Sequence, residues 1–116
     1  NVMPVLDMLL GAGISGLNPV EPRAGMDVLK LRERYGEALA LVGGVCNSVV
    51  LPRGDRDEIE RHVRPILEAG REGGIVIGSH SIGEDIAPET YDYYISLLER
   101  YGQYSCGATG KVGALR

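Results

Sequence analysis

A histidine that stands between two serines is the residue of this chain best suited to chemistry. The apolar segment 75–78 predicts a short buried strand, and Ser79, His80 and Ser81 follow it. The α/β folds place reactive and ligand-binding side chains in the loops after the carboxyl ends of strands. An imidazole can give or take a proton near neutral pH, so His80 is the candidate for acid–base catalysis. The alternative is that the imidazole only bonds a loop carbonyl and holds the loop in place.

Two further segments predict strands parallel to this one. The run Leu39–Val45 is continuously apolar, which is typical of a parallel strand buried on both faces. A shorter strand is expected around 16–18, ended by Pro19 because proline cannot donate a backbone hydrogen bond to a neighbouring strand. Parallel strands end at the same edge of a sheet, so the residues that follow each strand should lie near His80. These residues are Glu21 and Arg23 after the first strand, and Cys46, Asn47 and Ser48 after the second.

The side chains after the strands predict a site for a polar ligand. The expected substrate-binding residues are Glu21, Arg23, Asn47, Ser79 and Ser81, and the expected catalytic residue is His80. Glu21 could instead form an ion pair with Arg23. Cys46 could ligate a metal or act as a nucleophile, although a cysteine beside a buried strand is more often a small core residue. His62 is expected to be solvated, on the polar side of a helix.

Four helices are expected around these strands, from apolar residues spaced three and four apart. They cover residues 2–10 and 26–35, a stretch that begins after Asp55, and residues 88–101. Asp55 and Glu58 have the spacing of a capping box, in which each side chain bonds the other residue's backbone N–H. Pro65 lies inside the third pattern and removes a backbone hydrogen bond, so a kink or two shorter helices are expected there. The expected buried faces are Val2, Val5, Leu6, Leu9 and Leu10 in the first helix, and Tyr91, Tyr94, Ile95, Leu98 and Tyr101 in the last.

Helices and strands alternate along the whole predicted pattern, which begins and ends with a helix. Such alternation predicts an α/β fold with parallel strands joined by right-handed helical crossovers. A small open sheet and a segment of a (β/α)8 barrel both fit the pattern. A whole barrel needs roughly 250 residues, so these 116 residues would form its last three strand–helix units, preceded by a helix. The helix before the first strand favours the barrel segment, over residues 1–104, with an irregular tail over residues 105–116.

Composition and charge narrow the classes of partner. The 116 residues suit one domain of ordinary globular composition, with 44% hydrophobic and 24% charged residues. A net charge of −4 provides no basic surface for nucleic acid or for anionic lipid. No apolar run reaches the length of a transmembrane helix, and no basic leader opens the sequence. The two cysteines, Cys46 and Cys106, are too distant to suggest a disulfide framework, and a cytoplasmic location is expected.

Four motifs occur in one order and spacing within residues 1–104. They are Asp7-x3-Gly-Ala-Gly-Ile-Ser-Gly-Leu-Asn-Pro-Val-Glu-Pro22, Gly25-Met-Asp27, Leu41-Val-Gly-Gly-Val-Cys46, and Gly78-Ser-His-Ser-Ile-Gly83 with Pro88-Glu-Thr90. Together they resemble the C-terminal part of the uroporphyrinogen decarboxylase family. The resemblance implies a (β/α)8 barrel that needs no cofactor and removes acetate carboxyl groups from a tetrapyrrole bound at its C-terminal mouth. His80 stands at the position of the family's active-site histidine, where it would contact substrate carboxylates or help to deliver a proton.

The resemblance also bears on partners and leaves alternatives open. The family's arginine-rich motif, key aspartate and active-site tyrosine would lie before Asn1, so this segment alone is expected to be inactive without the N-terminal part of the barrel. The family includes corrinoid-linked methyltransferases that use zinc to activate a thiol, and their last zinc cysteine falls at His80. That branch would need zinc, a corrinoid partner and a methyl donor, with His80 and Cys46 as minor candidates for the metal. A homodimer is compatible with either branch, and a small non-enzymatic α/β binding domain is the third alternative.

Overall fold

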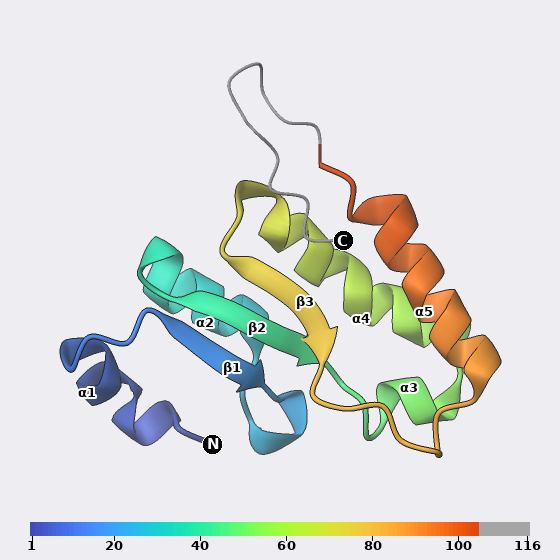
Figure 1. Ribbon diagram of the computed structural model, residues 1–116, viewed down its shortest axis with the longest axis horizontal. Helices are drawn as coiled ribbons and strands as arrows, with labels where there is room; N and C mark the ends of the chain where they lie inside the picture. The colour runs from blue at the N-terminus through green and yellow to red at the C-terminus, as the bar shows by residue number, and fades with distance from the viewer. Residues whose placement is uncertain (105–116) are drawn as a thin grey trace.

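The computed structural model describes residues 1–104; the tail 105–116, expected to be irregular, lies outside the described residues. Helices and strands alternate along the chain, as expected (Figure 1). The strands are β1 (Gly16–Val20), β2 (Ala40–Val45) and β3 (Ile75–Ser79). The α-helices are α1 (Leu6–Gly11), α2 (Val28–Tyr35), α3 (Val50–Arg53), α4 (Arg56–Ala69) and α5 (Pro88–Tyr101), and short 3-10 helices cover Met3–Val5, Pro22–Ala24, Gly36–Ala38 and Gly70–Glu72.

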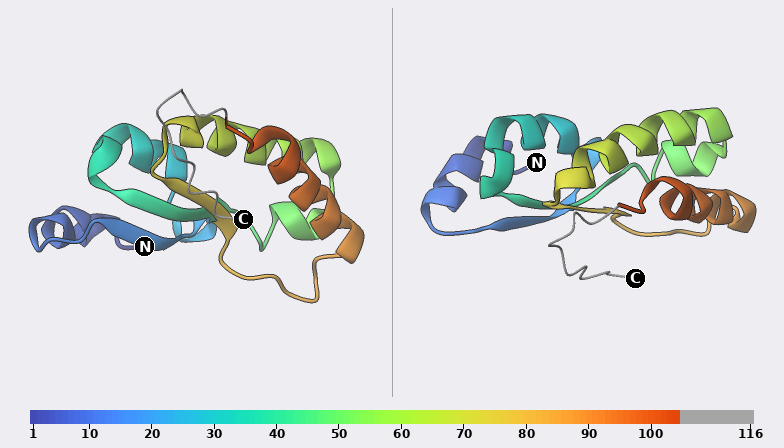
Figure 2. Two further views of the ribbon diagram at one scale, coloured as in Figure 1. Left: turned by 45° about the horizontal axis from the view of Figure 1, so that its top comes forward. Right: turned by 90° about the horizontal axis from the view of Figure 1, so that it is seen from above.

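The three strands form one parallel sheet in the order β1–β2–β3, which confirms the expected α/β class. Each connection therefore leads to the adjacent strand, and both connections cross the sheet in the same direction. Right-handed crossovers in one direction place their helices on the same face of a sheet. Figure 2 shows this arrangement, with α2 and α4 on one face and no helix of residues 1–104 against the opposite face.

An aliphatic core holds α2 and α4 against the sheet. Leu41 and Val45 of β2 are each 1% exposed, and Leu31 of α2 is equally buried. Ile59 and Val63 of α4 are completely buried in the same cluster. Full burial of such side chains stabilises by roughly 1.5–3 kcal/mol each. These contacts therefore fix both helices on one face, in a chain that contains neither Phe nor Trp.

Two glycines let neighbouring elements approach β2 closely. Gly43 and Gly44 have φ values of 123° and 95°, which L-residues with a side chain rarely adopt. A Cβ on Gly43 would lie 2.8 Å from the carbonyl oxygen of Val20 in β1. A Cβ on Gly44 would lie 2.9 Å from Cγ1 of Val28 in α2. The glycine pair thus allows both β1 and α2 to pack against the end of β2.

The first strand is longer than expected. Proline was expected to end it at Pro19, but β1 continues to Val20, so that expectation is wrong. The register against β2 shifts between Leu17 and Val20, and β1 lies at the edge of the sheet. An irregular edge strand tolerates proline because one side of the strand needs no backbone partner.

The helix α4 departs from two expectations. It runs without interruption over Arg56–Ala69, so of the two alternatives expected at Pro65 the division into two helices is wrong, while a kink stays a prediction. Pro65 is exposed, which leaves the unpaired carbonyl of the preceding turn accessible to water. The capping box is only half formed, since Oδ1 of Asp55 accepts the N–H of Glu58 at 3.0 Å. The carboxylate of Glu58 instead pairs with Arg53 at 3.1 Å.

The buried faces of the terminal helices are confirmed in part, since Leu6 and Leu10 of the first helix and Tyr94, Ile95, Leu98 and Tyr101 of α5 lie in or against the core. In the first segment only Leu6 is fully buried, while Val2 and Val5 are 36% and 43% exposed. In α5 the fully buried residues are Tyr94 and Leu97, whereas Tyr91 is 37% exposed. Periodicity alone located both helices, but the position of the neighbouring elements decides which side is covered. The four-residue helix α3 was not expected at all.

The helices of residues 1–104 are short. The longest, α4 and α5, have 14 residues each. A membrane span requires about 20 apolar residues, and none of the helices in this described part meets that requirement.

Candidate functional site

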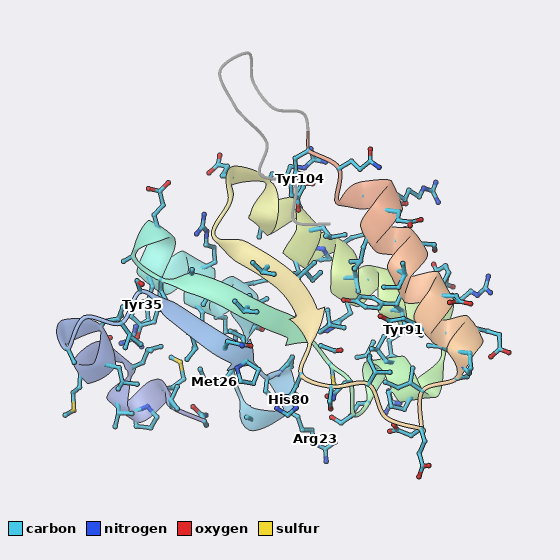
Figure 3. The ribbon with its side chains drawn as sticks, viewed as in Figure 1. Arg23, Met26, Tyr35, His80, Tyr91 and Tyr104 are labelled. Atoms are coloured by element: carbon cyan, nitrogen blue, oxygen red, sulfur yellow. The ribbon has the colours of Figure 1, made fainter. Side chains whose placement is uncertain are left out.

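The carboxyl ends of all three strands lie at one edge of the sheet, as the parallel order requires. β1 leads into Glu21, β2 into Cys46 and β3 into His80. Figure 3 shows the labelled side chains of His80 and Arg23 at this edge. The sheet therefore brings together the three polar loops that the sequence pointed to, and this edge is the candidate site.

His80 is the first residue after β3 and its side chain is exposed. Within residues 1–104 the side-chain hydrogen bonds to this loop run from Asn47 to Ser81 and none involves the imidazole of His80, so it does not hold its own loop by bonding a carbonyl. The flanking Ser79 is half-buried and ends the strand, whereas Ser81 is exposed. His80 thus presents both ring nitrogens to a ligand at the sheet edge.

Asn47 connects the loop after β2 to the loop after β3. Its Nδ2 donates to the carbonyl oxygen of Ser81 at 2.9 Å and to the hydroxyl of Ser81 at 2.8 Å. An amide nitrogen carries two hydrogens, so both of its donor positions are occupied. Binding of a substrate by Asn47 and Ser81 stays a prediction, but in this conformation they bind each other.

Glu21 and Arg23 are joined through the backbone. Oε1 of Glu21 accepts the backbone N–H of Arg23 at 3.1 Å and caps the 3-10 helix Pro22–Ala24. No ion pair joins the two side chains in the part of the chain that the structure describes. The guanidinium of the exposed Arg23 therefore remains available for an anionic ligand.

Cys46 is a buried residue, with 6% of its surface exposed. Burial raises the pKa of its thiol, but hydrogen bonds from the backbone of Val50, Ser48 and Val49 and from the Ser48 hydroxyl outweigh burial and lower the pKa below its ordinary value. Sγ lies 3.9 Å from Oγ of Ser48. The lowered pKa makes the thiol easier to ionise, yet the buried sulfur is out of a substrate's reach in this conformation.

His62 is the site residue that sequence reasoning missed. Its Nε2 accepts the backbone N–H of Cys46 at 3.0 Å, and the side chain is half-buried, so the expectation of a solvated histidine is wrong. The sequence spacing could have predicted that His62 faces the core, because His62 lies three residues after Ile59 and four before Ile66, on the same side of the helix. Burial lowers the pKa of His62 below the ordinary value for histidine.

Two hollows occur near α4. A small pocket of about 80 Å³ lies beside His62 and is closed on other sides by Asp27, Val28, Gly44 and Ile66. It has room for only one or two water molecules. A larger open groove of about 620 Å³ runs over α4 beside Glu60, Arg61 and Arg64, away from the strand ends.

No three His, Cys, Asp or Glu side chains within residues 1–104 are grouped as a metal site would need. Comparisons of the chain with protein-family models, with curated proteins and with solved structures found no match. The function is therefore inferred from the geometry at the strand ends and from the sequence motifs.

Proposed function

We propose that this chain forms the last three strand–helix units of a (β/α)8 barrel of the uroporphyrinogen decarboxylase family. The proposed reaction is the decarboxylation of acetate side chains of a tetrapyrrole held at the C-terminal mouth of that barrel. The observation that carries the proposal is an exposed His80, without a hydrogen-bond partner among residues 1–104, at the carboxyl end of a parallel sheet that is wound in one direction.

The winding of the sheet supports the barrel. A doubly wound sheet reverses its strand order and carries helices on both faces. Here the order β1–β2–β3 follows the chain, and α2 and α4 share a face. A barrel keeps this one direction until the sheet closes, with its helices outside.

An uncovered apolar surface also supports the barrel. We call the sheet face opposite α2 and α4 the bare face; Val42 and Val76 are paired on it, and Val76 is 49% exposed. The outer side of the N-terminal segment is apolar as well, with Val5 and Met8 exposed at 43% and 73%. In a complete barrel the bare face would line the interior, where side chains from several strands pack in layers.

The proposed reaction requires a proton donor near the substrate, and His80 can fill that role. Loss of carbon dioxide breaks the bond between the carboxyl group and the methylene carbon and leaves the electron pair on the tetrapyrrole. That carbon must then take up a proton. An imidazole at the mouth of the barrel can supply this proton or stabilise the acetate groups through hydrogen bonds, and Arg23 can pair with a further carboxylate.

The test is release of carbon dioxide from uroporphyrinogen by the complete protein that contains this segment. His80→Ala is expected to lower kcat by about 100-fold or more, since general acid catalysis contributes roughly 10²–10⁴-fold. Because His80 is exposed, the thermal midpoint should stay within about 2 °C of the parent. Glu84→Ala, a change at another exposed position in the same loop, is the matched control and should retain full activity.

Three outcomes would count against the proposal. Unchanged kinetics of His80→Ala would remove this residue from the active site. Methyl transfer from a corrinoid to a thiol, without carbon dioxide release, would favour the zinc-dependent branch. A folded, ligand-binding monomer made of these residues alone would favour the small binding domain.

A further inference from the structure

The loop between β3 and α5 is anchored at few points. Residues 80–85 are all exposed, and the next buried side chain is Ile86, at 5%. On the other side of His80 the backbone is held by β3, where Ser79 pairs with Val45 of β2. Between these points, the bonds from Asn47 to Ser81 are the side-chain hydrogen bonds that tie the loop to the rest of residues 1–104.

Asn47 is itself held by a well-anchored turn. The preceding residue, Cys46, is buried, and its N–H donates to His62 of α4 at 3.0 Å. The carbonyl oxygen of Cys46 accepts the N–H of Leu51 in α3 at 3.2 Å. The base of the Asn47 side chain is therefore fixed by two helices that pack on the sheet.

The orientation of the Asn47 amide follows from its partners. A carbonyl oxygen can only accept a hydrogen bond, so the atom of Asn47 that faces the Ser81 carbonyl must be the nitrogen. Aspartate is close in size but would place an anion against that carbonyl. The contact thus requires an amide and would be lost with the isosteric acid.

We propose that Asn47 is a positioning residue that sets the place of His80 by binding Ser81, the next residue in the chain. β3 fixes the backbone before His80, and Asn47 fixes the backbone after it. The backbone that carries the imidazole is then held on both sides, while within residues 1–104 the ring nitrogens make no hydrogen bond. The expected effect of Asn47 on kcat rests on the proposed function, whereas its expected effect on the mobility of the loop does not.

Kinetics of the complete protein test the role in catalysis. Asn47→Ala and Asn47→Asp should each lower kcat by about 10–100-fold with KM nearly unchanged, because a misplacement near 1 Å can cost about 100-fold. Ser81→Ala removes the hydroxyl but keeps the carbonyl contact, so its effect should be smaller. Glu84→Ala, a change at an exposed position of the same loop, should behave like the parent. In a His80→Ala background, Asn47→Ala should have little further effect on kcat.

Motion of the loop is the second measurement and needs no substrate. The backbone amides of His80 and Ser81 should show NMR order parameters near 0.85 in the parent, and below about 0.6 in Asn47→Ala. Order parameters equal in the two proteins, or already low in the parent, would overturn the positioning role. A rise in KM at constant kcat would overturn it as well and would make Asn47 a direct substrate ligand. If the parent shows no decarboxylation, the proposed function fails, while the order parameters still decide the role of Asn47.

Discussion

His62 and Cys46 show how a single contact joins a helix to the candidate site. Because Nε2 of His62 accepts the Cys46 N–H, the imidazole must be neutral, with its proton on Nδ1. The backbone of Gly44 and the carboxylates of Asp27 and Glu58 favour the charged form, but burial dominates and lowers the pKa of His62. Protonation would replace an acceptor by a donor that faces another N–H, and would thereby loosen the turn that carries Asn47.

The first prediction concerns the pH dependence of stability. Since the folded-state pKa of His62 lies below the unfolded value of about 6.5, the unfolded state binds more protons and stability falls as the pH drops. The contribution of His62 is complete above pH ~6.5 and is lost as the pH falls through the folded pKa. His62→Gln, which cannot titrate and keeps an acceptor, should reduce this loss by about 1 kcal/mol, the value of one hydrogen bond.

Urea unfolding at pH 7.5 and pH 5.0 measures this difference, at one protein concentration because association would shift the apparent stability. His80→Gln is the matched control, since His80 is exposed and makes no hydrogen bond within residues 1–104. An equal acid loss in the parent and in His62→Gln would show that His62 does not link the turn to pH.

At the scale of the element, Pro65 in the interior of α4 lowers the free energy of unfolding. An interior proline is roughly 3 kcal/mol less favourable than alanine in a helix, and the smaller freedom of the unfolded chain offsets up to ~1 kcal/mol of that. Pro65→Ala should therefore raise the free energy of unfolding by about 1–2 kcal/mol. Pro88 occupies the first position of α5, where proline fits, so Pro88→Ala should bring no gain. Urea midpoints compare the two variants, and a loss of stability in Pro65→Ala would mean that its ring packs better than its exposure indicates.

The neighbouring strands β2 and β3 offer a matched pair of glycines. Gly44 and Gly78 are register partners in neighbouring strands, but only Gly44 has a positive φ and a crowded Cβ position. Gly44→Ala should cost about 2–4 kcal/mol through backbone strain and overpacking against Val28. Gly78→Ala meets open space and should be neutral or stabilising by up to ~1 kcal/mol. Similar unfolding midpoints for the two variants would contradict the close approach of α2 to β2.

At the scale of the whole molecule, the sheet formed by residues 1–104 has two edge strands without a further strand partner in that range, and it has the bare face. Strand edges and uncovered apolar surface favour association. We expect the chain to self-associate, with a mass in sedimentation that rises with concentration. Val76→Lys, on the bare face, should weaken association at least several-fold, whereas Leu29→Lys, an equal change of charge on α2, should not. A strict monomer with one sharp unfolding transition would contradict this prediction.

Much of the architecture could be predicted because it depends on neighbours in the sequence. The apolar run before Cys46 forms β2, and Asp55 begins α4 through a bond to a residue three positions away. The three polar loops could be assigned to one sheet edge because parallel strands share a direction. The length of β1 and the continuity of α4 could not. Pro19 is tolerated because β1 is an edge strand, and Pro65 is tolerated because it lies on the exposed side of α4, where water can reach the carbonyl that proline leaves unpaired.

The sequence by itself determined the α/β alternation and the position of His80 directly after an apolar strand, since these follow from local periodicity and turn chemistry. The expectation that this strand is buried is wrong, because one of its faces is open and Val76 is 49% exposed. Only the tertiary structure decided that His62 binds the turn at Cys46 and that Asn47 binds Ser81. These partners lie 16 and 34 residues apart and leave no local pattern. Their contacts arise only when packing of the aliphatic core brings α4 and β3 to the end of β2, and packing is a property of the whole chain.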